Sequence, residues 1–407
     1  MTVAIERNHW ATANLGDVID LFDHKRIPLN SRERQARQGQ YPYYGAQGVI
    51  DHIDGYVFDG RYILVAEDGE NLNSKKLPLA LFADGKFWVN NHAHILRAKP
   101  DVADDTFLLA CLNNANIKPF VTGAAQPKLS QSNLRLIEIP LPPLPTQRRI
   151  AGILSAYDEL IENNQRRIRI LEEMARSLYR EWFVHFRYPG HESVSLVDSP
   201  LWQIPQGWEV RRILDFGKVI TGKTPSKANP DFYGENVPFV KTPDMHGNMF
   251  ILATGECLSN AGADSQANKL IPAGAICVSC IGTIGVVSIT TEDCQTNQQI
   301  NSIVLGKDHF CEFLFFHLQD AKQALENLGS NGATMGNVNK SKFESVEVIA
   351  PPSGLLERYH QFSASLLSEI LILSRQTANL RRTRDLLLPR LLSGQVGLAN
   401  DTLPITA

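Results

Sequence analysis

One segment of this 407-residue chain matches a phosphate-binding motif letter for letter. Residues Gly217 to Thr224 read GKVITGKT, the G-x-x-x-x-G-K-T pattern whose backbone amides cradle nucleotide phosphates. That chemistry requires a helix directly after the lysine, but Pro225 and Pro230 follow at once and prevent a long helix from starting there. We therefore do not expect nucleotide binding. A stand-alone enzyme that uses a nucleotide or S-adenosylmethionine is kept as an alternative hypothesis.

Three shorter patterns contain residue types that bind metals or bases. Cys277 and Cys280 have the spacing of a metal or redox pair, but no second pair accompanies them, so we expect buried free thiols. His92 and His94 would share one strand face without a third ligand, which favours a structural or base-contacting role over a metal site. The run NPDF at 229–232 resembles an adenine-holding N-P-P-F/Y signature, but its third residue differs. We expect neither a catalytic constellation nor a metal site.

The sequence is written twice. The run GAAQPKLSQSNLRLIEIPLPP from Gly123 parallels GATMGNVNKSKFESVEVIAPP from Gly332, and this offset of 209 residues holds for tens of residues without a gap. Fainter parallels, such as 90–94 with 297–301, precede it at offsets that drift from 198 to 207. A period near half the chain length indicates two similar modules rather than a solenoid. We expect α+β modules with a shared framework, strands at 62–66, 87–89, 275–278, 285–289 and 301–305, and helices at 104–114 and 308–328.

A long helix is predicted after each copy of the repeated run. Residues 146 to about 182, and their counterparts 209 residues on, carry an apolar stripe at seven-residue spacing. Each helix would be about 60 Å long and must bury its stripe, so we expect an antiparallel coiled coil with a pseudo-twofold axis. The alternative is that each helix packs on its own module. The stripe consists of Ile150, Tyr157, Asn164, Leu171 and Leu178, and of Tyr359, Leu366, Leu373, Leu380 and Leu387.

Asn164 is the one polar residue in that stripe. It would lie opposite an apolar series of the second helix, and we expect it to fix the register of the pair, as a lone polar seam residue often does.

Composition indicates a globular protein that does not coat nucleic acid indiscriminately. Apolar residues make up 43% of the chain, charged residues 20%, and the net charge is −3. No run of 18 apolar residues is present, no signal-peptide core opens the sequence, and six cysteines form no disulfide framework, so we expect cytoplasmic localisation and no membrane contact. The segment His24–Gln40 holds five Lys and Arg against one acid, as either a polyanion site or a solvated loop.

Seven short segments form a pattern through their order and spacing. They are YPYYGAQGVI (41–50), IPLPPLPTQ (139–147), LYREWF (178–183), IPQGWE (204–209), ITGKTP (220–225), VPFVKTPD (237–244) and LLPRLLSG (387–394). In this order the chain resembles a type I restriction–modification specificity subunit over nearly its whole length. The resemblance accounts for the false phosphate-loop match. One departure is that the second copy replaces Gln147-Arg148-Arg149 with Leu356-Glu357-Arg358, which makes symmetric partner contacts there doubtful.

The resemblance implies a non-catalytic subunit that selects a DNA sequence. Modules at 1–145 and 191–350 would each read half of a bipartite target in double-stranded DNA. Helical regions at 146–190 and 351–395, followed by a tail at 396–407, would set the gap and seat two modification subunits. These partners would use S-adenosylmethionine to methylate adenine N6, and two restriction subunits would use ATP and Mg. This chain would bind no cofactor. A two-domain adaptor that binds only protein is the alternative.

We expect DNA contacts from cationic and amide side chains of the modules. Arg pairs with guanine, Asn or Gln with adenine, and Lys with phosphate. For each candidate, a solvated loop position is the alternative. In the first module the candidates are Lys25, Arg26, Arg32, Arg34, Arg37, Tyr44, His92 and Lys128. In the second they are Lys223, Lys227, Lys241, Thr242, Asn297, Gln298, Asn337 and Lys340.

Overall fold

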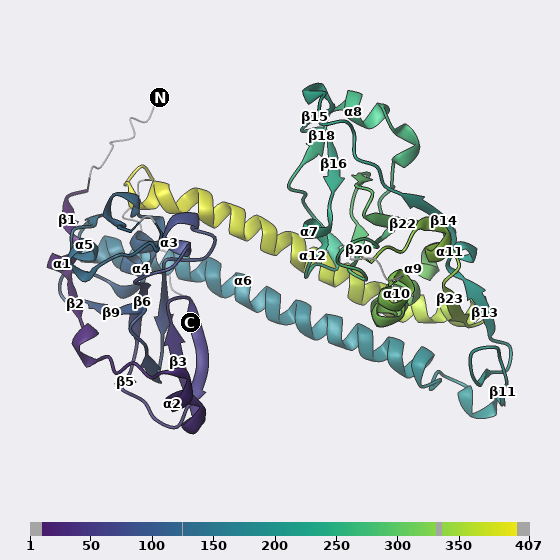
Figure 1. Cartoon of the computed structure of the whole chain (residues 1–407), viewed down its shortest axis with the longest axis horizontal. Coiled ribbons are helices and arrows are strands. Elements are labelled where there is room, and N and C mark those ends of the chain that lie inside the picture. Colours follow the sequence, from purple (N-terminus) through teal and green to yellow (C-terminus); the bar gives the residue numbers. More distant parts are fainter. Residues whose placement is uncertain (1–9, 124, 331–335, 397–407) are drawn as a thin grey trace. The chain divides into compact units, whose positions relative to one another are not determined.

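The computed structural model describes residues 10–123, 125–330 and 336–396 (Figure 1). The chain divides into two compact units: residues up to Glu162 together with those from Asn379 onward, and residues Asn163–Ala378. Each unit therefore contains one module and a part of each long helix. In the described part of the chain, no helix is both long and apolar enough to cross a membrane.

The first module is built on two four-stranded sheets. The main sheet is antiparallel and has the order β2 (Ile19–Leu21), β9 (Ala93–Ala98), β6 (Tyr62–Ala66), β7 (Ala80–Ala83). The second sheet has the order β4 (Gly48–Ile53), β3 (Gln38–Gly45), β8 (Lys86–Val89), β5 (Phe58–Asp59), and in it β3 and β8 are parallel. Helix α4 (Asp105–Asn114) packs on the main sheet and buries Phe107 and Leu108.

The second module repeats this framework. Its main sheet has the order β14 (Gly217–Thr221), β22 (Ile300–Leu305), β19 (Ile276–Ser279), β20 (Val287–Thr290), β17 (Phe250–Ile251). Its second sheet has the order β15 (Tyr233–Gly234), β18 (Cys257–Leu258), β16 (Val237–Val240), β21 (Gln295–Thr296), with β16 and β21 parallel. Helices α9 (Cys311–Asp320) and α10 (Lys322–Gly329) follow β22. The predicted strands and helices of both modules are confirmed within a few residues.

Smaller elements connect these sheets. The last strand before each long helix belongs to a two-stranded antiparallel sheet. These sheets are β1 (Thr12–Asn14) with β10 (Glu138–Pro140), and β13 (Glu209–Arg212) with β23 (Glu347–Ala350). The short helices are α1 (Leu15–Val18), α2 (Ser31–Ala36), α3 (Asn71–Ser74), α5 (Gln131–Arg135), α7 (Thr242–Met245), α8 (Asn260–Asp264) and α11 (Lys340–Glu344). Strands β11 (Leu196–Val197) and β12 (Ile204–Pro205) form the link before the second module.

The two long helices are α6 (Leu144–Tyr179), which continues as a π-turn over Arg180–Val184, and α12 (Ser353–Leu392). In the second unit the end of α6 lies beside the start of α12 (Figure 1), where Trp182 packs on Tyr359 at 5.6 Å between ring centroids and Arg167 pairs with Glu369 at 2.7 Å. In the first unit the start of α6 pairs with the end of α12 through Asp158 and Arg384, 2.5 Å apart. The helices therefore run antiparallel within each unit, as the stripe predicts.

The seam is more deeply buried at positions four residues after those in the predicted series. Ile150, Tyr359 and Leu373 are buried, but Tyr157, Leu171, Leu178, Leu366, Leu380 and Leu387 are only half-buried. The more buried series on α6 includes Leu154, Ile161, Ala175 and Trp182. Both helices also contribute to the module cores, Ile150 and Leu391 in the first unit and Tyr179 and Tyr359 in the second. Each long helix thus packs both on the other helix and on the modules.

Asn164 is buried, and its level along the helix pair can be counted from the contact between Trp182 and Tyr359. It is 8% exposed, and the register set by Trp182 and Tyr359 brings it level with Thr377, which is 5% exposed. The Thr377 hydroxyl has no hydrogen-bond partner among the described residues.

Two isoleucines on α12 give a direct test of this packing. Ile370 is 1% exposed and Ile372 is 46% exposed. We expect Ile370→Ala to lower the free energy of unfolding of the second unit by about 2–5 kcal/mol, since it removes buried methylenes and leaves a cavity. Ile372→Ala changes the helix propensity identically and should stay within about 0.5 kcal/mol of the unmodified chain. Denaturant unfolding followed by tryptophan fluorescence measures both, and equal losses would contradict the seam.

Candidate nucleic-acid interface

Four segments of the first module meet at one end of its main sheet. They are 22–26 after β2, 67–69 after β6, 90–92 before β9 and 126–129, and together we call them the first loop edge. The N–H of Glu67 donates to the carbonyl of His92 (2.9 Å), and the N–H of Leu129 donates to the carbonyl of Glu67 (2.8 Å). The Asn90 side chain accepts from the N–H of His92 at 2.8 Å and fixes the turn into β9.

The second module forms the same arrangement from 221–224, 280–282, 297–299 and 336–340, which we call the second loop edge. The N–H of Cys280 donates to the carbonyl of Gln299 (2.7 Å), and that of Val338 donates to the carbonyl of Cys280 (2.9 Å). Asn297 accepts from the N–H of Gln299 at 3.1 Å, as Asn90 does in the first module. Isolated bridges Asp68–Lys128 and Ile281–Asn337 are likewise equivalent. The two edges therefore share a backbone and differ in side chains.

On the first loop edge, three of the predicted contact residues converge on two acids. Arg26 pairs with Glu67 at 2.7 Å, Lys128 pairs with Glu67 at 3.3 Å, and His92 pairs with Asp68 at 2.7 Å. Burial opposes the ionisation of Glu67, but the hydrogen bonds and charges of Arg26, His94 and Lys128 lower its pKa below the usual value. Lys128 and His92 remain about half exposed, so both are accessible to a nucleic acid.

Lys25 and Tyr44 lie next to this edge. Lys25 is exposed and lies over the Phe22 ring at 5.3 Å. The carbonyl of Tyr44 accepts from the N–H of Asn90 at 3.0 Å, which connects the end of β3 to the turn before β9. Burial raises the pKa of the Tyr44 hydroxyl, which therefore stays protonated.

The three remaining arginines among the predicted contacts of the first module lie on or beside α2 rather than on the loop edge. Arg34 pairs with Asp51 at 3.0 Å and stacks on Tyr43, and Arg37 pairs with Asp54 at 2.8 Å and stacks on Trp88. Arg32 is exposed and has no ion pair among the described residues. The patch predicted at His24–Gln40 is thus partly neutralised along the β3–β4 hairpin, by acids that lie outside the segment in sequence.

On the second loop edge, Lys223, Gln298 and Asn337 are exposed and Asn297 is buried. The Thr224 hydroxyl donates to the Gln298 side chain at 2.6 Å, and the N–H of Lys223 donates to the carbonyl of Thr296 at 2.9 Å. Asn337 occupies the position equivalent to Lys128. The structure therefore brings four predicted residues together, with Asn297 shaping the turn and the other three accessible.

Lys241 and Thr242 follow β16, whose last residue, Val240, accepts from the N–H of Asn297 at 3.1 Å. Lys241 forms an ion pair with Glu256, which lowers the pKa of that carboxyl. Thr242 is buried, and its hydroxyl has no partner among the described residues.

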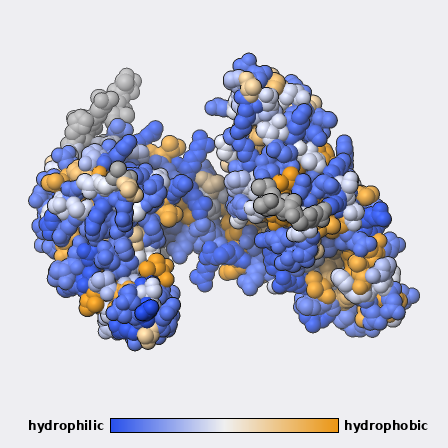
Figure 2. All heavy atoms as spheres, viewed as in Figure 1, coloured by the Kyte–Doolittle hydropathy of each residue, from blue (hydrophilic) through white to orange (hydrophobic). Residues whose placement is uncertain are grey.

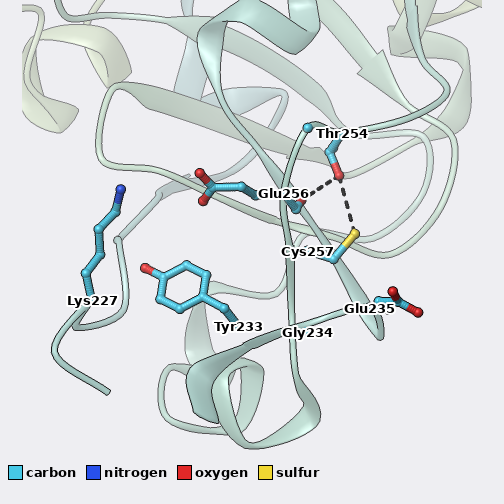
Figure 3. A pocket seen from close by; sticks show the side chains of 8 residues that line it. Lys227, Tyr233, Gly234, Glu235, Thr254, Glu256 and Cys257 are labelled. Carbon is cyan, nitrogen blue, oxygen red and sulfur yellow. Dashed lines mark hydrogen bonds between the residues drawn. The ribbon is translucent and has the colours of Figure 1, made fainter. Parts of the chain in front are cut away.

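Lys227 lies at an open pocket of about 610 Å³ in the second module. In Figure 3 its amino group, the Tyr233 hydroxyl and the Glu256 carboxylate border the same space. The Tyr233 hydroxyl donates to the carbonyl of Pro225 at 2.9 Å, which closes the loop that carries Lys227. Lys340, the first residue of α11, is 49% exposed and lies 3.4 Å from Glu344.

Sequence reasoning missed the acids and the buried polar residues that hold these edges. Asp23, Glu67 and Asp68 organise the first edge, and Gln299 and Asn301 the second. The repeat contained a signal for these residues. The 198-residue offset aligns Asp23 with Thr221, and the parallel of 90–94 with 297–301 aligns His94 with Asn301, so polar residues recur at both positions.

The misleading motifs have structural explanations. The first five residues of the phosphate-loop match form β14, and the next helical element is the three-residue turn Pro230–Phe232, so no helix N-terminus faces the glycines. Cys277 and Cys280 are free and buried, and burial raises the pKa of both thiols to about 11. Among the described residues, no three His, Cys, Asp or Glu side chains are placed to hold a metal ion.

Comparison with known proteins gives consistent matches over most of the chain. A family model described as type I restriction modification DNA specificity domain matches residues 8–173 and 205–355. The type I restriction enzyme HindI specificity subunit of Haemophilus influenzae is 32% identical over 327 residues, which are 66% of this chain and 71% of that protein. A putative type I restriction enzyme specificity subunit of the same species, S.HindORF215P, is 27% identical over 344 residues, or 83% and 82% of the two chains.

A solved structure shares the fold. The crystal structure of a type I restriction–modification system S subunit from M. genitalium aligns with a TM-score of 0.65 at 14% identity, covering 96% of this chain and 98% of that one.

Lys340 allows a test of a phosphate contact. We expect Lys340→Ala to weaken binding to all DNA sequences alike and to reduce the slope of log affinity against log salt by about 1, because one phosphate is no longer neutralised. Lys307→Ala is the matched control, since Lys307 is exposed beyond the opposite end of β22. Fluorescence anisotropy across a salt series measures both. Loss of a single base preference with an unchanged slope would assign Lys340 to base reading instead.

Proposed function

The chain belongs to the family of type I restriction–modification specificity subunits, whose role is DNA target recognition, and we propose that each module reads one half of a bipartite target. The chain itself is not the catalytic component. The observation that carries the proposal is the pair of equivalent loop edges, which present different side chains on one backbone. Two similar readers with different surfaces suit a target whose two halves differ in sequence.

The chemistry of the edges fits base and phosphate contacts. Exposed Lys128, Lys223 and Lys340 suit phosphates, and Gln298 and Asn337 suit the adenine edge in the major groove. Glu67 and Asp68 suit the amino group of cytosine once their basic partners turn to phosphate. We assign Lys25, next to the first loop edge, to a flanking phosphate contact, and we propose the same role for Arg32 and Lys227, which are exposed but lie outside the edges.

The helices supply the spacing between half-sites. With 36 residues in α6 and 40 in α12, their lengths are about 54 and 60 Å. Half-sites one DNA turn apart are separated by about 34 Å, which helices of this length can span. We propose recognition domains at 1–145 and 191–350, helical regions at 146–190 and 351–395, and a tail at 396–407.

Two grooves at equivalent places support two copies of a partner. In the first unit a groove of about 740 Å³ is lined by α4, β7 and the end of α12, with Leu77, Leu109 and Leu388 among its walls. In the second, a groove of about 350 Å³ is lined by α9, the start of β20 and the end of α6. Because the same framework elements form both, we propose that one modification subunit occupies each.

Apolar surface on the helices also favours partner binding. Exposed side chains include Met174 on α6 and Phe362 on α12. Figure 2 shows hydrophobic residues among hydrophilic ones on the surface of the second unit. We propose that the partners bring S-adenosylmethionine for methylation, that two restriction subunits using ATP and Mg complete the complex, and that it acts in the cytoplasm on double-stranded DNA.

The groove of the first unit can be tested with matched leucines. Leu77 lines it and is 55% exposed, whereas Leu136 is 54% exposed and does not line it. We expect Leu77→Asp to weaken assembly with the modification subunit about tenfold, because a carboxylate would be desolvated in the interface. Leu136→Asp should assemble normally. Titration followed by size-exclusion chromatography measures both, and equal assembly of the two variants would remove this groove from the interface.

Target recognition can be tested by mapping methylated adenines in DNA from cells that co-express this chain with its modification subunit. We expect a split motif with defined bases on both sides of a fixed gap. Replacing residues 1–145 with those of a family member of different specificity should change one half only. A change in both halves would contradict separate readers, and no methylation from an assembled complex would favour the protein-binding adaptor.

A further inference from the structure

A buried polar clamp lies behind the first loop edge. His94, on β9, is 1% exposed. Its Nδ1 lies 2.6 Å from Oδ2 of Asp23, and its Nε2 lies 2.8 Å from the carbonyl of Leu129. Asp23 follows β2, and Leu129 follows Lys128, so one imidazole joins two of the segments that carry predicted DNA contacts.

The second module has the same clamp built from neutral groups. Asn301, on β22, is 2% exposed and occupies the position of His94. Its Nδ2 donates to the carbonyl of Val338 at 3.2 Å, and its Oδ1 accepts from the Thr221 hydroxyl at 2.6 Å. Thr221 corresponds to Asp23 when the β2–β9 register is extended by two residues, and Val338 corresponds to Leu129 at the 209-residue offset of the repeat. The geometry is shared, but the charge is not.

Hydrogen-bond chemistry assigns the protons of the first clamp. A backbone carbonyl only accepts, so Nε2 of His94 must carry a hydrogen. An ionised carboxylate also only accepts, so Nδ1 must carry one too, and the ring is then an imidazolium. Burial opposes ionisation of Asp23, but the hydrogen bond and the charge of His94 lower its pKa below the usual value. Asp23 is therefore the ionised partner of a charged ring.

The charged groups around His94 determine how its protonation changes the net charge of the cluster. Glu67 lies 3.8 Å from Nδ1 and is itself paired with Arg26 and Lys128. Asp23 also faces Arg26, at 3.5 Å. Asp68 and His92 form a separate pair on the outside of the edge. With Arg26, Lys128 and a charged His94 against Asp23 and Glu67, the cluster has one net positive charge, and without that proton it has none.

We infer that His94 and Asn301 are positioning residues for the two half-site readers, and that reading of the first half alone depends on a proton held by a buried histidine. His94 touches no base in this scheme. It fixes the segments that carry Arg26 and Lys128 and contributes the net positive charge of an edge that faces DNA phosphates. This inference rests on the proposed reading of one half-site by each module.

Grafting one clamp onto the other tests the inference. The complex with the modification subunit is titrated with duplexes that carry the mapped target, or a single base-pair change in the first or the second half. We expect His94→Asn to reduce discrimination in the first half about tenfold, the size of one base contact, and to leave the second half unchanged. The double variant Asp23→Thr, His94→Asn reproduces the neutral clamp and should recover discrimination to within about twofold.

The outcomes separate the hypotheses. Equal loss in both halves, or a double variant no better than His94→Asn alone, would overturn the positioning role. An unmodified chain that shows no target at all would instead defeat the proposed function. If His94→Asn does not fold, the reverse graft Thr221→Asp, Asn301→His should retain reading of the second half, and its failure counts against equivalent clamps.

The charge of the clamp has its own readout, which needs no variant to fold. Imidazole spectra of the complex labelled with ¹⁵N-histidine should show both ring nitrogens of His94 protonated at neutral pH. A single protonated nitrogen on His94 would overturn the charged clamp.

Discussion

Burial of the apolar seam between α6 and α12 is the constraint on which the rest of the structure depends. Each helix is too long to be buried within one module, and each carries charges on the faces away from the seam. Each helix therefore contributes apolar residues to both module cores. In each unit one end of α6 and the opposite end of α12 pack together and close a module core, with Ile150 and Leu391 in the first and Tyr179 and Tyr359 in the second. The end of α12 thus completes the core of the first module.

This arrangement explains why sequence segments and compact units do not coincide. The long helices begin at Leu144 and Ser353, close to the proposed ends of the recognition domains, but the first compact unit also includes residues from Asn379 onward. Because an α-helix rises by a fixed amount per residue, a pair of helices in fixed register is a suitable spacer. The two buried polar residues Asn164 and Thr377 lie near the middle of these helices. A shift in the helix register would carry a polar side chain into an apolar layer.

The sequence predicted the repeat, the long helices and most strands, because these depend on periodicity that the chain displays directly. It predicted the loop edges only in part. Lys128 and Asn337 are at equivalent positions, as the constant offset of 209 requires. Arg34 and Arg37 were grouped with them because of local charge, but the Asp51 and Asp54 that pair with them come from a hairpin whose register is a tertiary property. The central role of Glu67 was likewise hidden, since its basic partners lie 41 and 61 residues away in the chain.

The two modules also show which positions of a duplicated reader are free to diverge. Where a bond joins backbone to backbone, as from Leu129 to Glu67 and from Val338 to Cys280, the side chains are unconstrained, and Glu67 and Cys280 differ completely. Where a side chain must accept a backbone N–H, asparagine is retained at both 90 and 297. His94 and Asn301 are intermediate, because each donates to the carbonyl on the neighbouring segment but also needs its own matched partner, Asp23 or Thr221, so the two members of a clamp change together. Charge can therefore change at that position without loss of backbone geometry, so the electrostatics of one half-site reader can diverge from those of the other on a common scaffold.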